Sequence, residues 1–379
     1  MTATMYTLGR VARGVWLLAL ALWPSACVED QQRLSAELVV DASAGLDAGV
    51  VADLPVLDAG SSMLDASVPA ADATVALDAF VVPAIAFPSA APARPFLLSE
   101  VALYAEMSSK LLAPDLVSYE PLYVLWSDGA VKARHYRLPA GSKIDDADPD
   151  HWQFPVGTMF FKEFAKDGKK LETRLIARTG PGPRDYFFGS FVWRDDETDA
   201  VLAWDGMSNV RGSQHDVPSV KQCGTCHNGE PGRVLGFSAV QSPLAVATTP
   251  LLFGGLAQPY LVPGTKEQAD ALGYLHANCG HCHNPGGSAR PDTDLMLRLS
   301  VTEQSVTDTR IYQTSVGKPL QSFQGSALTL RVVAGEPEQS GLYFRMSQRG
   351  PRTQMPPIAS ELVDPAGLAT IAAFISHLP

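Results

Sequence analysis

The chain has 379 residues, of which 46% are hydrophobic and five are cysteines, and its formal net charge at pH 7 is −11. This negative charge argues against nucleic acid as a partner and disfavours adsorption to an anionic lipid surface. It suits a basic protein partner, although a charge that only keeps the chain soluble is an equally good explanation.

The first 26 residues have the pattern of a signal peptide. Arg10 and Arg13 precede an apolar stretch, residues 15–23, that is too short to span a bilayer. The run Pro24-Ser25-Ala26-Cys27 resembles a bacterial lipobox, in which the cysteine is acylated and the chain is cleaved before it. Such boxes usually carry an aliphatic residue where this chain has Pro24, so an ordinary signal peptide with an incidental Cys27 is the alternative. Both predict export, and we expect a lipid anchor on Cys27.

Residues 27–93 are predicted to be a disordered tether rich in Ala and Asp. Asp-Ala pairs recur between residues 41 and 79, and Phe80 and Phe87 are the only aromatic residues of the stretch. A segment so poor in large side chains cannot bury enough surface to offset its ordering entropy. It resembles the tethers that follow the acylated cysteine of bacterial lipoproteins.

Residues 94–263 are predicted to form an antiparallel β domain. Two alternating, aromatic-rich runs, residues 158–164 and 171–178, flank Asp167-Gly168, which is a strong hairpin signal. Further strands are predicted at residues 122–126, 186–193 and 200–202.

Two five-residue motifs carry the chemistry of the chain. They are Cys223-Gly224-Thr225-Cys226-His227 and Cys279-Gly280-His281-Cys282-His283. Cys-x-x-Cys-His is the attachment pattern of c-type haem. Its two thiols bond to the two vinyl groups of the porphyrin, and the histidine becomes the proximal iron ligand. The motifs therefore predict two covalently attached c-type haems, with His227 and His283 as iron ligands.

Two other chemistries use paired cysteines. A zinc site built from both Cys-x-x-Cys pairs usually has about 15–20 residues between the pairs, whereas Cys226 and Cys279 are much further apart. Zinc also gives no reason for a histidine directly after each pair. A thioredoxin-like redox pair expects a single motif in a βαβ setting.

Residues 264–379 are predicted to form a mostly helical domain. Thr265 and Gln268 form a capping box that opens a helix leading into the second motif. Near the end of the chain, Asp364 is an N-cap with Pro365 at the first helical position. The final helix carries its apolar residues on one face, at Leu368, Ile371, Ile375 and Leu378. We expect the two helices to pack on each other.

Met355, in the run Met355-Pro356-Pro357, is the predicted sixth ligand of the second haem. A thioether is a soft ligand, and Met/His ligation raises the reduction potential of haem iron. The first haem has no comparable partner. Four residues are weak candidates for its sixth ligand, namely Met159, Met207, His151 and His215. If none of them ligates, the iron at His227 is open and can bind small molecules.

The remaining histidines are interpreted as structural or solvated, and they are His135, His276, His281 and His377. The sequence shows no paired-carboxylate, Ser-His-Asp or phosphate-loop pattern above chance.

The segment from Thr265 to Pro379 resembles a class I cytochrome c in its order of helix, haem motif, Met-Pro and closing helix. It departs from that family by two strand-like segments between the motif and Met355, at residues 295–298 and 328–333. Together with the strands predicted earlier in the chain, this resemblance gives an expected α+β chain, with an antiparallel β domain followed by a mostly helical cytochrome c-like domain.

From Phe96 onward the chain resembles an uncharacterised family of exported bacterial dihaem c-type cytochromes. The matching runs include Leu125-Trp126-Ser127-Asp128 and Phe154-Pro155-Val156-Gly157-Thr158, besides the two haem motifs. The run Pro155-x-Gly157-Thr158 followed by Lys162-Glu163 is also similar to β-rich cytochromes whose haem is cross-linked to a lysine.

Two functions follow as hypotheses. The first is electron transfer between periplasmic redox partner proteins by a lipid-anchored dihaem cytochrome, at the periplasmic or cell-surface face of the outer membrane. The second is a dihaem oxidoreductase in which an open haem at His227 performs the chemistry and the haem at His283 relays electrons.

Overall fold

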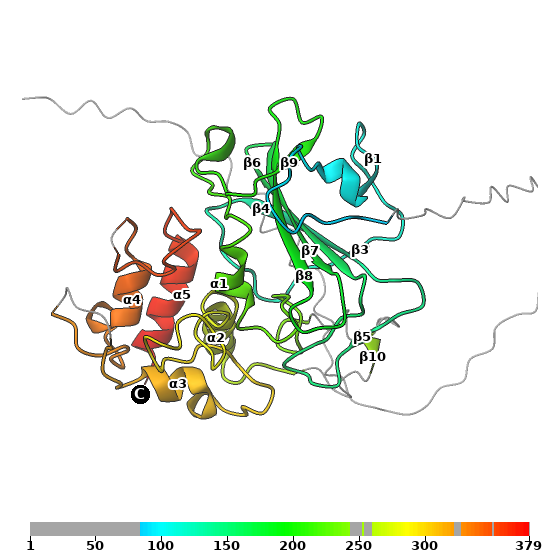
Figure 1. Cartoon of the computed structure of the whole chain (residues 1–379). Helices are drawn as coiled ribbons and strands as arrows, with labels where there is room; N and C mark the ends of the chain where they lie inside the picture. Colours follow the sequence, from blue (N-terminus) through cyan, green and yellow to red (C-terminus); the bar gives the residue numbers. More distant parts are fainter. Residues whose placement is uncertain (1–83, 243–251, 254–259, 322–326, 351, 379) are drawn as a thin grey trace, which may run out of the picture. The chain divides into compact units, whose positions relative to one another are not determined.

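The computed structural model describes residues 84–242, 252–253, 260–321, 327–350 and 352–378. These residues belong to one compact unit, Thr74–Pro379. An antiparallel sheet and a group of short helices make it a mixed α+β structure, as predicted (Figure 1). The predicted signal peptide, Cys27 and most of the predicted tether lie outside the described residues. Among those that are described, we find no helix with the length and apolar character of a membrane span.

The main sheet has six strands, and every neighbouring pair is antiparallel. In spatial order the strands are β3 (Val117–Ser118), β4 (Val131–Arg137), β6 (Met159–Lys166), β7 (Lys169–Arg178), β8 (Tyr186–Trp193) and β9 (Ala200–Leu202). Smaller pairings join β1 (Tyr104–Glu106) to β2 (Leu111–Leu112), and β5 (Ile144–Asp145) to β10 (Leu252–Phe253).

The predicted hairpin is confirmed at the turn between β6 and β7. Asp167 and Gly168 both have positive φ, 51° and 74°. Two successive left-handed residues form the tight turn that matches the twist of the flanking strands, and Asp-Gly is a favoured pair for it. The strands predicted at residues 186–193 and 200–202 are also present.

The strand predicted at residues 122–126 is wrong. This segment makes its backbone hydrogen bonds outside any sheet. Leu122 N donates to the Gln241 carbonyl, and Trp126 N donates to the Asn278 side chain. The segment connects β3 to β4 and runs past α2 between them, so Tyr123 packs into the core around that helix.

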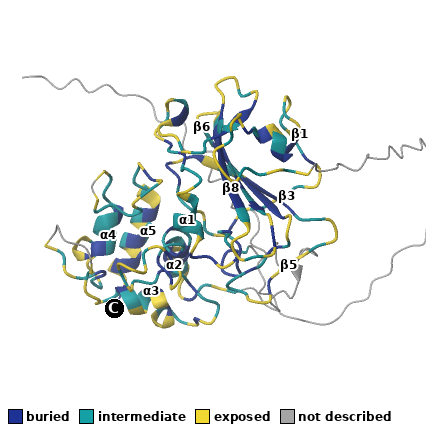
Figure 2. Ribbon diagram, in the orientation of Figure 1, coloured by how far each residue is buried: buried dark blue, intermediate teal, exposed yellow. Residues whose placement is uncertain are grey.

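The two faces of the sheet bury different residues. One face packs a large apolar core that includes Phe161, Leu175 and Phe191, all essentially inaccessible to solvent. The other face carries aromatic residues at one end, where Phe160 and Tyr136 pack around Phe237. The central strands are buried on both sides (Figure 2).

The helices gather beside the sheet, as α1 (Cys223–His227), α2 (Lys266–Asn278), α3 (Arg310–Ser315), α4 (Gly341–Met346) and α5 (Pro365–Ser376). The described residues also contain four 3-10 turns, η1 (Leu98–Val101), η2 (Val210–Gly212), η3 (Val306–Asp308) and η4 (Pro337–Gln339).

Both predicted helix starts are confirmed. Thr265 and Gln268 form the capping box of α2, and the Asp364 side chain caps α5 at Gly367 N. The two helices pack on each other through a shared core that contains Leu272, Leu275 and Ile371. Figure 1 shows α1 and α2 between the sheet and the outer helices α4 and α5.

The strand-like segments expected between the second motif and Met355 do not form strands. Residues 295–298 have no ladder partner, and Leu297 N instead donates to the carbonyl of His283. Residues 328–333 make only isolated bridges, from Val332 to Val316 and from Leu330 to Pro319. Each segment pairs with a loop, so neither can extend into a ladder.

The last ten residues of the predicted tether contact the folded unit. Residues 84–93 form no helix or strand, but Ile85 and Phe87 pack against the core on the first face of the sheet. The ring of Phe87 stacks on Phe187 with centroids 4.7 Å apart. Packing therefore begins before residue 93.

The packing of Tyr123 on α2 gives a test of this arrangement. A Cβ added at Gly273 would lie 2.0 Å from the Tyr123 ring, so Gly273→Ala forces the ring to move. We expect a loss of about 1–3 kcal/mol from overpacking. This exceeds the gain of about 1 kcal/mol that Ala brings in a helix. The measurement is the free energy of unfolding by chemical denaturation.

Gly286→Ala is the control, because its new Cβ would have no neighbour closer than 3.6 Å. Equal stability of the two variants would contradict the close contact between Tyr123 and α2.

Candidate functional site

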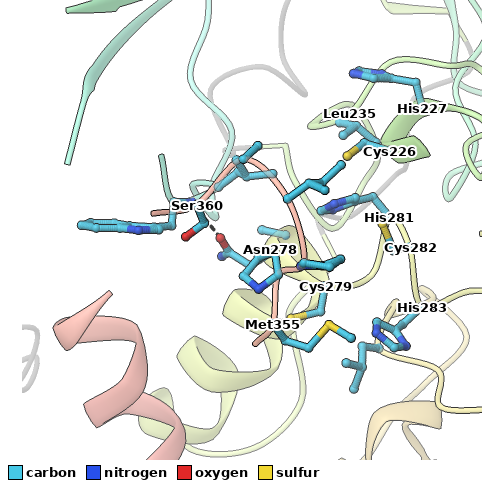
Figure 3. Close-up of a pocket in the computed structure, with 18 of the residues that line it drawn as sticks. Cys226, His227, Leu235, Asn278, Cys279, His281, Cys282, His283, Met355 and Ser360 are labelled. Atoms are coloured by element: carbon cyan, nitrogen blue, oxygen red, sulfur yellow. Dashed lines mark hydrogen bonds between the residues drawn. The ribbon is translucent and has the colours of Figure 1, made fainter. Parts of the chain in front are cut away.

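A cavity of about 530 Å³ lies between the second face of the sheet and the helices. Both Cys-x-x-Cys-His motifs line it (Figure 3). So does Met355, from the loop between α4 and α5. This volume is in the range of cofactor pockets. All four motif cysteines are free thiols.

The first motif forms the short helix α1, and its histidine is oriented by the chain that follows. His227 Nδ1 lies 2.8 Å from the carbonyl oxygen of Arg233, to which it donates in the neutral ring. Burial lowers the pKa of His227 to about 3, so the ring is neutral and Nε2 keeps a free lone pair. A carbonyl that fixes the far nitrogen in this way is typical of metal-ligating histidines.

The second motif begins where α2 ends, with Cys279 as the C-cap residue. His283 is 9% exposed and lines the cavity. Burial lowers the pKa of His283, so this ring is also neutral. The buried, neutral ring and the neighbouring thiols fit a group that enters the cavity and bonds to the motif.

The two motifs contact each other. The sulfurs of Cys226 and Cys282 and a ring nitrogen of His281 lie within 4.8 Å of one another. Cys282 Sγ is also 3.8 Å from the Thr225 carbonyl. A hydrogen bond from Cys226, helped by His281, lowers the pKa of Cys282. This group could hold a metal ion, but it takes one cysteine from each motif rather than the two complete pairs considered for zinc.

Close backbone approach makes this contact possible. A Cβ at Gly229 would lie 2.7 Å from Gly287 Cα, so only glycine lets the loops after the two motifs meet. One residue further on, the buried Glu230 forms an ion pair with Arg298. Arg298 also donates to the carbonyl of Asp150 at 2.7 Å, which ties the second-motif segment to the β5 region.

The Met355 loop is held by residues near the sheet. Asp128 Oδ1 accepts hydrogen bonds from Glu361 N and Leu362 N, at 3.0 and 2.8 Å. Met355 N donates to the Arg345 carbonyl of α4. Figure 3 shows the Met355 side chain extending toward the His283 ring, with Cys279 beside them. The predicted second site, His283 and Met355, is thus brought together.

None of the four candidates for the first site's sixth ligand lines the cavity. Met207 is 52% exposed, and Met159 is buried in the core on the opposite face of the sheet. His215 bonds Glu172 at 2.8 Å, and His151 lies beside Glu230 and Arg298. The structure therefore does not bring these residues to His227.

The other histidines differ among themselves. His135 contacts Ser118, His276 accepts from Leu299 N at 3.0 Å, and His377 is exposed, in agreement with structural or solvated roles. His281 departs from the expectation, because it lies in the cavity wall beside Cys226.

The sheet supplies a polar wall that the sequence did not reveal. Arg134, Lys162, Arg174 and Ser190 all line the cavity. They come from four different strands, so only the register of the sheet places them together. Arg174 and Lys162 lie close enough to His227 that their charges add to the effect of burial in lowering its pKa.

A buried carboxylate, Glu172, forms an ion pair with Arg174 of this wall. Glu172 is fully buried, forms an ion pair with Arg174 at 2.7 Å and contacts His215. Burial acts to raise the pKa of Glu172, but Arg174 and the His215 hydrogen bond outweigh it and lower the pKa to about 2. The carboxylate is therefore ionised throughout the neutral range.

Comparisons of the chain with models of known protein families, with curated proteins and with solved structures found no match.

Glu172 should make the stability depend on pH. Its pKa is about 2 in the folded protein, against about 4.3 for an unperturbed glutamate. The stability it contributes is present above the unfolded pKa and is lost as the pH falls through the folded pKa. We expect a loss of up to about 3 kcal/mol between about pH 5 and pH 2. The measurement is the free energy of unfolding at several pH values.

Glu172→Gln should be less stable at pH 7, because Arg174 loses its carboxylate, and its stability should fall less steeply with acid. Glu338→Gln, at an exposed glutamate, should keep the original slope. Identical slopes for Glu172→Gln and the unaltered protein would refute the role given to Glu172.

Proposed function

We propose that the protein is an exported dihaem c-type cytochrome that transfers electrons through two covalently attached haems. One observation carries the proposal. The two motifs lie far apart in the sequence, yet both line one cavity, and the sulfurs of Cys226 and Cys282 contact each other. Two attachment sites that share one cavity suit a protein that passes electrons from one group to the other.

The residues present fit the proposed groups. Cys223 and Cys226 would hold the first haem and Cys279 and Cys282 the second, through thioether bonds. His227 and His283 would ligate the irons, and the Arg233 carbonyl already orients His227. When bound, the haems supply one-electron redox chemistry. The chain's own part is to orient the ligands and to exclude water from a largely apolar cavity.

Residues 264–379 support a more specific proposal. The order of α2, second motif, Met355 loop and α5 matches a class I cytochrome c, and α2 packs on α5. We therefore interpret residues 264–379 as a mostly helical cytochrome c-like domain, in which His283 and Met355 would both ligate the iron of the second haem. In this proposal Asp128 and Trp126 act as positioning residues, because they hold the loop that presents Met355.

The cellular setting is part of the same proposal. Haem is attached to such motifs outside the bacterial cytoplasm, which agrees with the signal-like N-terminus. Cys27 would carry a lipid anchor on the periplasmic or cell-surface face of the outer membrane. The partners would be periplasmic redox proteins, and the net charge of −11 favours basic ones.

A second candidate function is a dihaem oxidoreductase with an open iron at His227. The observation that favours it is the absence of Met159, Met207, His151 and His215 from the cavity lining. An iron without a protein ligand on its sixth position can bind and transform small molecules.

The haem content tests the main proposal. Protein exported in a host that attaches c-type haem should carry two covalent haems per chain, measured by intact mass and by the pyridine haemochrome spectrum. Replacing Cys223 and Cys226 by Ser should leave one haem, because the thioether bonds of one site are lost.

Cys27→Ser is the control. It should keep both haems and move the protein from the membrane fraction to the soluble fraction. A chain with no covalent haem that binds zinc instead would overturn the proposal.

Met355→Leu tests the sixth ligand. Leu has nearly the volume of Met but no sulfur, so the fold should persist. The haem at His283 should become partly high-spin, bind carbon monoxide and show a lower reduction potential. The measurements are the visible spectrum with and without carbon monoxide and a redox titration.

Met346→Leu is the matched control, because Met346 is buried and lines the same cavity. It should leave the spectrum unchanged. If Met346→Leu gave the high-spin form and Met355→Leu did not, the ligand would be Met346.

A further inference from the structure

Four polar side chains form one row across four neighbouring strands. Arg134 of β4 lies directly opposite Lys162 of β6, Lys162 opposite Arg174 of β7, and Arg174 opposite Ser190 of β8. Directly opposed residues of antiparallel strands point to the same face of the sheet. All four line the cavity that contains both motifs.

Two of these basic side chains have no counter-ion among the described residues. Arg134 is only 6% exposed, and its guanidinium makes no hydrogen bond or ion pair with any described residue. The amine of Lys162 likewise has no hydrogen-bonding or carboxylate partner in the described part of the chain, and contacts the ring of Phe164 at 4.9 Å. Ser190 is 2% exposed, and its hydroxyl is also unpartnered among described atoms.

The surroundings do not neutralise the row. Glu172, the carboxylate that forms an ion pair with Arg174, is also engaged by His215. Lys132, from the same face of β4, adds a further cation, which donates to the Leu125 carbonyl at 2.6 Å. Glu120 acts on Arg134 only from an exposed position, without an ion pair. Like charges placed directly opposite each other destabilise a sheet, and a buried charge without a partner is costly.

We propose that Arg134, Lys162 and Arg174, with the Ser190 hydroxyl, form an oxyanion-binding wall of the cavity. The ligand is a carboxylate or a small inorganic oxyanion, because guanidinium, ammonium and hydroxyl donors in one row match the acceptors of such a group. Its source is either a propionate of the haem held by the first motif or a free oxyanion from solution. The first source rests on the proposed function, and the second does not.

The decisive variant is Lys162→Met, made in the exported, haem-loaded protein. Met is also unbranched and fills similar space, but carries no charge. If an anion occupies the wall, the variant leaves that anion short of a donor, and the Tm falls by about 2 °C or more. If nothing is bound, the variant relieves repulsion within the row, and the Tm rises.

Two further measurements separate the sources. The first is the Tm of the desalted protein with increasing formate, the smallest carboxylate, at constant ionic strength. A free oxyanion site gives a Tm that rises with formate concentration, and Lys162→Met abolishes this rise. The second is the set of propionate bending bands in the resonance Raman spectrum. A propionate on the wall shifts these bands in Lys162→Met and in Arg134→Met.

A Tm that rises with formate concentration, or a shift in the propionate bands, supports the oxyanion-binding wall. The inference is overturned if the Tm of Lys162→Met rises, or if formate has no effect on the Tm and the propionate bands are the same in all variants. Lys166→Met is the control, because its amine donates to the Asp128 carbonyl and does not line the cavity. Lys166→Met should keep the rise of the Tm with formate and should leave the propionate bands unchanged. Protein without covalent haem would refute the proposed function alone. The formate titration would still show whether the wall binds an oxyanion.

Discussion

The contact between the two motif loops is the constraint on which the site depends. Gly229 and Gly287 bring two backbones closer than any side chain would allow, and this places Cys226 beside Cys282. The buried ion pair of Glu230 and Arg298 then holds the two segments in position. Removing one partner of a buried ion pair leaves the other as an uncompensated buried charge, so substituting either residue should destabilise the fold. The cavity has its present form because these loops meet.

The sheet forms another wall of the cavity, and its two faces have different roles. One face is filled by apolar side chains such as Phe161 and Phe191, which supply the burial that stabilises the sheet. The other face is apolar around Phe237 and also carries the row of Arg134, Lys162 and Arg174, which lines the cavity. The sheet can carry this polar row because the apolar side chains on its opposite face supply the burial that stabilises it.

Local signals in the sequence were sufficient for local structure. Asp167-Gly168 predicts its hairpin and Thr265 with Gln268 predicts the start of α2, because each signal is complete within a few residues. The strand predicted at residues 122–126 fails because tertiary contacts, to Gln241 and Asn278, take its backbone hydrogen bonds. The motif residues of the site are visible in the sequence. The meeting of the motifs is not, because it depends on contacts between segments far apart in the chain.

The cation row shows most clearly why part of the site escapes sequence analysis. Arg134, Lys162 and Arg174 each look like an ordinary charged residue in an amphipathic strand, and only the strand register aligns them. In the folded chain they violate two rules at once, since like charges face each other and Arg134 is buried without a partner in the part of the chain that the structure describes. Natural proteins break such rules mainly at functional sites, where a gain elsewhere offsets the cost. An unfilled row would weaken the same three strands that position the cavity, so the fold itself favours an anion there.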